Sequence, residues 1–210
     1  ICEGSTLLLS KSTASPYAKV LWSTSGTGTF KDPDVLNPTY IPGVMDILNG
    51  KVLLTLKAFT ECASASDYMM VTISAKPKLS AGADFAVCSG EEITISQATA
   101  ENVGGVKWTT TGKGTLTSSA FLNTKYTPAA GESGVVSFIL SASGKDGCSG
   151  TTLTDTLKVT IYEPLKVQAS DDISILKNYT TILSAVASNG SGFYYFSWQP
   201  PDLVQAGNSS

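Results

Sequence analysis

Short runs of alternating apolar and polar residues fill the chain, and Gly, Pro, Asn, Asp and Ser separate these runs. Alternation with a period of two places every second side chain on the same face, as in a strand with one buried face. No run follows the 3.6-residue period of an amphipathic helix. Residues 51–57 are apolar on both faces, so we expect this strand to pass through a core. The pattern predicts an all-β protein.

Turn signals divide the first three quarters of the chain into two sets of predicted strands. The first set is expected near residues 5–11, 18–24, 28–31, 37–42, 51–59 and 68–75. The second set is expected near residues 83–88, 91–98, 105–111, 114–117, 123–128, 134–143 and 153–162. A Gly-Thr-Gly segment at residues 26–28 and a Gly-Lys-Gly segment at residues 112–114 each fall between two strands. We expect both segments to form hairpin turns.

The two sets are copies of one repeat, because matching residues recur at a constant offset. Cys2 and Cys62 recur 86 residues later as Cys88 and Cys148. The same offset relates the following pairs: Trp22 and Trp108, Gly26 and Gly112, Gly28 and Gly114, Tyr40 and Tyr126. After Pro164 a third copy begins, in which residues 180–184 and 194–198 parallel two strands of the first.

The repeat predicts three domains along the chain. Residues 1–76 form the first repeat, which lacks a counterpart of the first predicted strand of the second. Residues 77–163 form the second repeat, and residues 164–210 form a partial third. We therefore expect the 210 residues to be a window from a longer tandem array.

Each repeat has six or seven short strands and one Trp, which is typical of an immunoglobulin-like β-sandwich. The Trp is expected to fill the space between the two sheets. An exposed aromatic platform is the alternative interpretation, but the flanking residues alternate as in a buried strand. The predicted structural core residues are Trp22, Trp108 and Trp198.

Composition restricts the chemistry that the chain can perform. It contains no His, all 14 of its basic side chains are Lys, and its net charge is −3. Without His, neither Ser-His-Asp nor Cys-His catalysis nor an imidazole metal site can be built. Without Arg and with an excess of acidic groups, binding to nucleic-acid phosphates is disfavoured. We therefore expect no enzymatic activity, no cofactor, no metal ion and no nucleic-acid partner.

The chain also gives no sign of membrane insertion, because no apolar run reaches the about 20 residues that a membrane span requires. Acidic pairs are few, and Asp171-Asp172 follows the boundary between the second and third repeats. A calcium ion at that boundary is one interpretation of this pair, and a solvated loop is the other.

The four cysteines predict two disulfides within repeats. Cys2 and Cys62 are 60 residues apart, as are Cys88 and Cys148, and each complete repeat carries one of each kind. The repeat therefore favours the pairs Cys2–Cys62 and Cys88–Cys148, which would require an oxidising compartment. A simple immunoglobulin topology, however, would place the two positions at opposite ends of a sandwich. Either the topology departs from that scheme or the pairing is different.

The motifs resemble those of a known class of repeats. They read C-x-G, then W-[ST]-T-x-G-x-G-T, then L-N-x-x-Y-x-P, then a G-x-V strand and a late Cys. This order resembles the tandem PKD-like and Ig-like repeats of giant bacterial cell-surface adhesins, of the gliding-motility type exported by type 9 secretion. The resemblance covers residues 1–163 well and residues 164–210 partly.

The resemblance implies an extracellular, non-enzymatic protein on the cell surface. Such a segment would act as a stalk or spacer in adhesion or gliding motility, with neighbouring repeats of the same longer chain as its partners. A surface glycan or protein ligand remains open. One alternative function is a glycan-binding module that uses exposed rings from this group: Tyr17, Tyr40, Tyr68 and Tyr126. The other is a filament subunit whose incomplete repeat accepts a strand from a neighbour.

Overall fold

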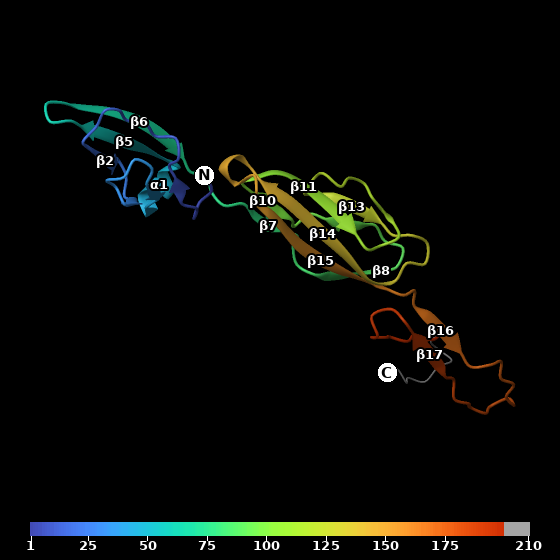
Figure 1. Ribbon diagram of the computed structural model, residues 1–210. Coiled ribbons are helices and arrows are strands. Elements are labelled where there is room, and N and C mark those ends of the chain that lie inside the picture. The colour runs from blue at the N-terminus through green and yellow to red at the C-terminus, as the bar shows by residue number, and fades with distance from the viewer. Residues whose placement is uncertain (200–210) are drawn as a thin grey trace.

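The structure is a computed structural model that describes residues 1–199, and its strands form three groups in a row along an elongated molecule (Figure 1). We call β1 to β6 the first unit, β7 to β15 the second unit, and the residues from 164 to 199 the third segment. The first unit contains β1 (Leu7–Leu8), β2 (Lys19–Thr24), β3 (Thr29–Lys31), β4 (Thr39–Ile41), α1 (Val44–Asn49), β5 (Lys51–Phe59) and β6 (Ser64–Thr72).

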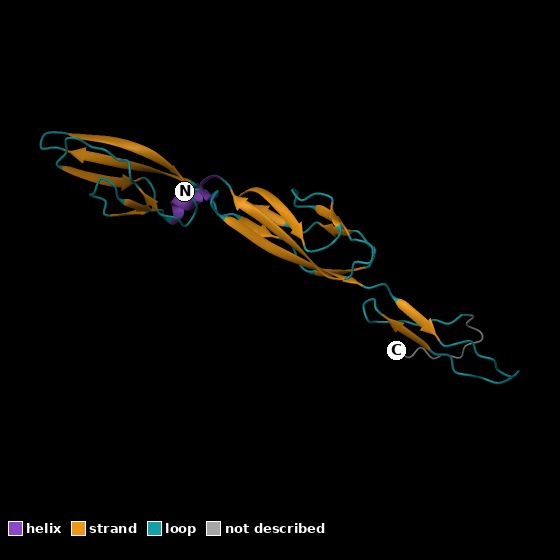
Figure 2. Ribbon diagram, turned by 45° about the vertical axis from the view of Figure 1, so that its right-hand side comes forward, coloured by secondary structure: helices purple, strands orange, loops and turns teal. Residues whose placement is uncertain are grey.

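The second unit repeats the order of these strands with β7, β8, β10 and η1 added, and it has no counterpart of α1. It contains β7 (Lys78–Ser80), β8 (Phe85–Cys88), β9 (Ile93–Ile95), β10 (Thr99–Glu101), β11 (Val103–Thr110), β12 (Thr115–Leu116), β13 (Thr124–Thr127), β14 (Gly134–Gly144), the 3-10 helix η1 (Asp146–Cys148) and β15 (Thr152–Tyr162). The third segment contains β16 (Lys166–Ala169) and β17 (Ala185–Ser188). The two helices lie near the N-terminus, where the two units meet (Figure 2).

Two sheets form the framework of each unit. In the first unit they have the strand orders β2-β5-β6 and β1-β4-β3. In the second unit the orders are β11-β14-β15-β8 and β12-β13-β9, and β7 pairs with β10 in a short ribbon. All of these pairs are antiparallel except β15 with β8, which run parallel. Strand β8 therefore covers an edge of the second unit that the first unit leaves open at β6.

Each unit has its own apolar core between its two sheets. Alternate residues of β14 point inward, as a period of two requires. Trp108 is 1% exposed in the second core, and Trp22 is buried at the same place in the first. Their indole N–H groups donate to equivalent carbonyls, those of Leu122 and Leu36, both at 3.3 Å. The prediction of an all-β fold built from tandem immunoglobulin-like sandwiches is confirmed.

The two Gly-rich segments differ from the prediction. Residues 26–28 follow β2 and precede β3, and these strands belong to different sheets. Residues 112–114 cross between sheets in the same way, from β11 to β12. The hairpin prediction is therefore wrong, because a hairpin joins neighbouring strands of one sheet. The pattern also missed β7, β10 and α1, which are too short to show a period.

The third segment contains less structure than its sequence predicted. Strands β16 and β17 pair antiparallel, but residues 180–184 and 194–198 form no strand. Trp198 is half-buried and belongs to neither core. In the complete units the strand with the Trp pairs with β5 or β14, and no counterpart of these is present in the described residues 164–199. Residues 200–210 of the predicted third repeat lie outside the described residues.

Candidate functional site

A disulfide joins the first unit to the second. Cys2 is bonded to Cys148 of η1, with a Cα–Cα distance of 4.6 Å and a sequence separation of 146 residues. Cys2 forms a parallel bridge with Ser74, just beyond the end of β6. The N-terminus consequently lies between the two units in Figure 1. The connecting chain and the disulfide thus cross the same junction side by side.

Hydrogen bonds surround this disulfide on both sides. The Gly147 N–H donates to Ser74 Oγ at 3.0 Å, and Asn102 Nδ2 donates to the Lys76 carbonyl at 3.1 Å. The Lys76 N–H donates to Glu3 Oε2 at 3.0 Å, within the first unit. A Cβ on Gly147 would lie 2.4 Å from the carbonyl oxygen of Ile1, so only glycine fits there. The connecting chain between the units is therefore held by side chains from both.

The predicted disulfides, Cys2–Cys62 and Cys88–Cys148, do not form. Strands β6 and β15 have 9 and 11 residues and are therefore about 30 and 36 Å long. Each strand separates the two cysteines of its own unit, whereas bonded Cα atoms lie within about 7 Å. The pairing prediction is wrong for this reason. The conflict with an immunoglobulin topology, visible in the sequence, was the signal that favoured another pairing.

The other two cysteines have free thiols and are exposed. Cys62 lies in the turn between β5 and β6, and Cys88 is the last residue of β8. Strand β8 runs away from the disulfide-linked junction and ends beside the third segment (Figure 1). The two thiols consequently lie at opposite ends of the pair of units.

A buried carboxylate organises the crossover in the first unit. Asp46, at the third position of α1, is 1% exposed. It accepts hydrogen bonds from the N–H groups of Thr27 and Gly28 at 2.9 and 3.0 Å. It also accepts from the Gly43 N–H at 2.8 Å and from the hydroxyl of Tyr40. One carboxylate thus satisfies donors from the crossover, the helix start and the core.

Glu132 makes the equivalent contacts in the second unit. It accepts from the N–H groups of Lys113 and Ala129 at 2.7 and 2.9 Å and from the Tyr126 hydroxyl at 2.8 Å. The Gly114 N–H donates to the same hydroxyl at 2.7 Å. We call each of these groups a tyrosine–carboxylate cluster. Its role is structural, because its polar atoms are used by the fold and face the core.

The electrostatics of the clusters follow from burial and hydrogen bonding. Burial raises the pKa of the Asp46 carboxyl, but the bonds from Tyr40 and three backbone N–H groups outweigh it and leave this pKa below its usual value. The pKa of Glu132 is lowered in the same way. Burial, together with the bond to Asp46, raises the pKa of Tyr40 to about 12. At neutral pH both carboxylates are therefore ionised inside the folded units.

Sequence reasoning missed both carboxylates. Asp46 and Glu132 are six residues after Tyr40 and Tyr126, and they are 86 residues apart. The constant offset was therefore a usable signal, although Asp and Glu differ in identity. Two fewer residues follow the cluster in the second unit, where a turn replaces α1.

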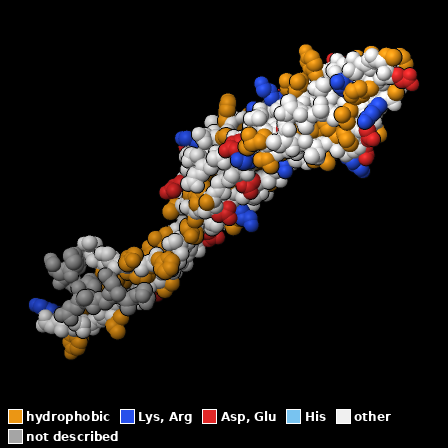
Figure 3. Space-filling view, turned by 90° about the vertical axis from the view of Figure 1, so that its left-hand side faces the viewer, with side chains coloured by type: hydrophobic (Ala, Val, Ile, Leu, Met, Phe, Trp, Pro, Cys, Tyr) orange, Lys and Arg blue, Asp and Glu red, His pale blue; other side chains and the backbone are white. Residues whose placement is uncertain are grey.

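The remaining candidates are distributed over the surface or buried. Tyr40 and Tyr126 are fully buried, which contradicts their use in a sugar-binding row. Tyr17 and Tyr68 are exposed, but the former is in a loop and the latter is on β6. Residues 171–172 are exposed, and no group of three or more metal-ligating side chains occurs in residues 1–199. The face in Figure 3 shows scattered charges of both signs.

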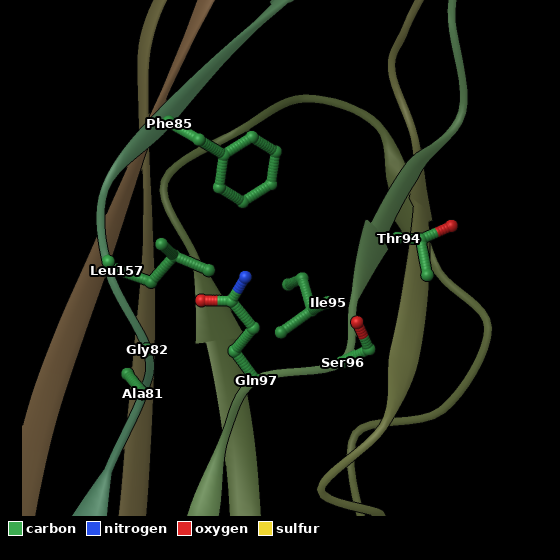
Figure 4. Close-up of a pocket in the computed structure, with 9 residues that line it drawn as sticks. Ala81, Gly82, Phe85, Thr94, Ile95, Ser96, Gln97 and Leu157 are labelled. Atoms are coloured by element: carbon green, nitrogen blue, oxygen red, sulfur yellow. The ribbon is translucent and has the colours of Figure 1, made fainter.

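A cavity of about 160 Å³ opens between the two sheets of the second unit. Figure 4 shows the Gln97 side chain between Leu157 and Ile95, with Phe85 above it. Ligand sites usually enclose about 300–1,000 Å³. This cavity is too small for such a ligand, and its lining is mostly apolar.

The Gly residues of the crossover generate a first prediction, for Gly112→Ala. An added Cβ would lie 2.0 Å from Tyr126 Oη, so the tyrosine–carboxylate cluster would be displaced. We expect a loss of about 2–3 kcal/mol in the free energy of unfolding, measured by urea denaturation. The control is Gly105→Ala, where no atom lies within 4 Å of the new Cβ. Equal effects of both substitutions would contradict this role of Gly112.

The lowered carboxyl pKa values generate a second prediction, a loss of stability in acid. The folded pKa of Asp46 and of Glu132 lies below the unfolded value of about 4, so their contribution is complete above that pH. It is lost as the pH falls from about 4 through the folded pKa. The melting temperature between pH 7 and pH 2.5 measures this loss.

The variant for this test is Asp46→Asn with Glu132→Gln. It should melt lower at pH 7, because a charged acceptor is lost in each unit at about 2 kcal/mol each. It should also show a flatter dependence on pH in acid. Asp34→Asn is the control, because Asp34 is exposed and should leave the profile unchanged. An unchanged acid slope in the double variant would refute the assignment.

Comparisons with known proteins show similarity at the level of fold. No protein family and no curated protein sequence matches the chain. Among solved structures, an I-band fragment of titin matches at 11% identity and a TM-score of 0.43, over 80% of this chain and 76% of that one. Mouse protocadherin-24 matches at 9% and 0.44, over 83% and 67%. A domain fragment of intimin matches at 15% and 0.39, over 74% and 92%.

These similarities concern the arrangement of the chain and not its activity. The one α-helix in the described residues, α1, has 6 residues, so no helix among them could cross a membrane. Two features of residues 1–199 remain to be related to a function. They are the junction disulfide and the pair of tyrosine–carboxylate clusters.

Proposed function

We propose that the chain is a load-bearing segment of a cell-surface protein, in which tandem immunoglobulin-like units form a stalk or spacer. The proposed repeats are residues 1–76, 77–163 and 164–210. The finer assignment, a gliding-motility-type adhesin exported by type 9 secretion, is supported by the sequence motifs alone. The coarser role, a non-enzymatic module of the adhesion type, is also supported by the architecture.

One observation carries this proposal, the disulfide between Cys2 and Cys148. Units joined by a single flexible linker bend freely, and an interface of modest size does not prevent this. Here two covalent connections, the polypeptide chain and the disulfide, cross one junction. Gly147 and Asn102 donate hydrogen bonds to the connecting chain. Such a junction resists bending and transmits tension without relying on non-covalent contacts alone.

The same bond supports an extracellular location. Disulfides form and persist in oxidising compartments and are rare in the cytosol. The surface adds support, because charged residues are only 15% of the chain and Ser and Thr make up about a quarter. The proposed partners are neighbouring repeats of the same longer chain.

The two alternatives have less support. Two of the rings expected in a glycan-binding module, Tyr40 and Tyr126, are buried in the tyrosine–carboxylate clusters and are not available to contact a sugar. A strand-exchanging filament could use the open edge of β6, where Tyr68 is exposed. In the second unit, β8 of the same chain covers the corresponding edge of β15. Exchange between molecules is therefore not a general property of this repeat.

Force spectroscopy between the two chain ends tests the load-bearing role. Residues 3–147 lie inside the loop that the Cys2–Cys148 bond closes, so they cannot extend while the bond is intact. Replacing both cysteines by Ser should release these residues and add about 500 Å to the fully stretched length. The first unit, which carries no tension between the chain ends while the bond is intact, should then unfold under load.

The matched control replaces Cys62 and Cys88 by Ser, which removes the same number of thiols outside the junction. It should stretch to the length of the unmodified protein. If the Cys2→Ser, Cys148→Ser variant reaches only that same length, the junction carries no covalent bond and the proposed role fails.

A further inference from the structure

We propose that Cys62 and Cys88 each form a further disulfide junction of the same kind as Cys2–Cys148. In each, the partner is the complementary cysteine of another copy of this repeat, docked end to end. This inference rests on the tandem arrangement in the proposed function.

Cys88 occupies in the second unit the place that Cys2 occupies in the first. Cys2 bridges in parallel to Ser74, directly after the last strand of its unit. Cys88 lies opposite Tyr162 in the parallel pair of β8 and β15, at the end of the last strand. Both cysteines are therefore at the end of the unit that faces the following segment. Cys2 is bonded there, whereas Cys88 has a free thiol.

Cys62 likewise occupies the place of Cys148. Each lies in the connection between the two long strands of its unit, β5 to β6 and β14 to β15. These connections are at the end that faces the preceding unit, since the second one contacts Ser74 and Ala75 through Cys148 Sγ at 3.5 Å. The connection that carries Cys62 points away from the junction in Figure 1 and is exposed.

The two free thiols cannot bond to each other within one molecule. They lie at opposite ends of two units in a row, and each long strand alone measures about 30 Å or more. Two molecules, or two successive copies in one chain, can bring a Cys62-type and a Cys88-type thiol together. The Cys2–Cys148 bond shows the geometry of that contact.

A cavity lies next to Cys88. A cavity of about 440 Å³ lies between the second unit and the third segment. Cys88, Glu91 and Tyr162 line it on one side, and Leu165 and Ser191 line it on the other. The cavity lies within the range of about 300–1,000 Å³ that binding sites usually enclose.

Formation of each bond requires an oxidant, and a small-molecule disulfide such as oxidised glutathione suffices. Two protein thiols lose two protons and two electrons and become one S–S bond. The glutathione disulfide accepts them and leaves as two molecules of reduced glutathione. The reaction proceeds by thiolate attack through a mixed disulfide, for which exposed thiols such as Cys62 and Cys88 are accessible.

A series of such disulfide junctions would have a mechanical consequence for the second unit. Tension would enter the second unit through the chain at residue 77 and the disulfide at Cys148. It would leave through the disulfide at Cys88 and the chain at residue 163. The covalent path between these points follows β8 and β15, which already lie extended and paired. Residues 89–147 would lie outside the path, so tension could not unfold them into a long chain. Each unit would then be nearly inextensible.

The first arm of the test mixes two variants of the full chain, Cys62→Ser and Cys88→Ser, in a buffer of reduced and oxidised glutathione. Each variant alone can form only like-to-like bonds. The mixture can form the Cys62–Cys88 bond, and end-to-end docking raises the effective thiol concentration. We expect about tenfold more covalent dimer in the mixture, with the Cys62–Cys88 peptide found by mass spectrometry.

The second arm replaces residues 164–210 by another copy of residues 77–163, which contain a complete core. Cys88 should then bond to the turn cysteine of the added copy. A bond in the mixture assigns the partner to a second molecule, and a bond only in the extended chain assigns it to a repeat of the same chain. The inference is overturned if neither bond forms, or if like-to-like dimers are equally abundant. Neither result affects the force test of the Cys2–Cys148 junction.

Discussion

The length of an extended strand is the constraint on which this structure depends. Strands β6 and β15 run the full length of their units, so the two cysteines of one repeat are held about 30 Å or more apart. A disulfide cannot bridge that distance, but it can bridge two units that meet end to end. The same geometry that prevents a bond within a repeat therefore creates one between repeats. The elongated form of the molecule and its reinforced junction both follow from this constraint.

Within each unit, a second constraint comes from the polar backbone of the crossover between sheets. A segment that leaves one sheet for the other has N–H groups that no strand can satisfy, and buried donors need partners. Asp46 and Glu132 supply the acceptors, and Tyr40 and Tyr126 connect them to the core. The Gly residues of the crossover are needed because a Cβ would collide with these groups. The most recognisable motif of the repeat thus serves folding and not ligand binding.

These two constraints together underlie the mechanical role that we propose for the repeat. Each unit buries its own core, so copies can be joined without redesigning the interior. The junction adds a covalent connection at the point where tandem domains usually bend. The described surface offers scattered charges and cavities of about 160 and 440 Å³, and residues 1–199 contain no cluster of metal-ligating groups. This combination is the basis of the proposed role as a stalk or spacer.

The strand pattern and the constant offset of 86 residues were sufficient for the all-β class, the repeated sandwiches and the places of Trp22 and Trp108, because these depend on local alternation and on copying. The pairing of Cys2 with Cys148, the crossover path of residues 26–28 and the contacts of Asp46 could not be obtained in that way. They depend on which ends of the strands meet and on which sheet each strand joins. A linear pattern shows which side chains share a face, whereas the packing of the sheets determines which distant residues come within bonding distance.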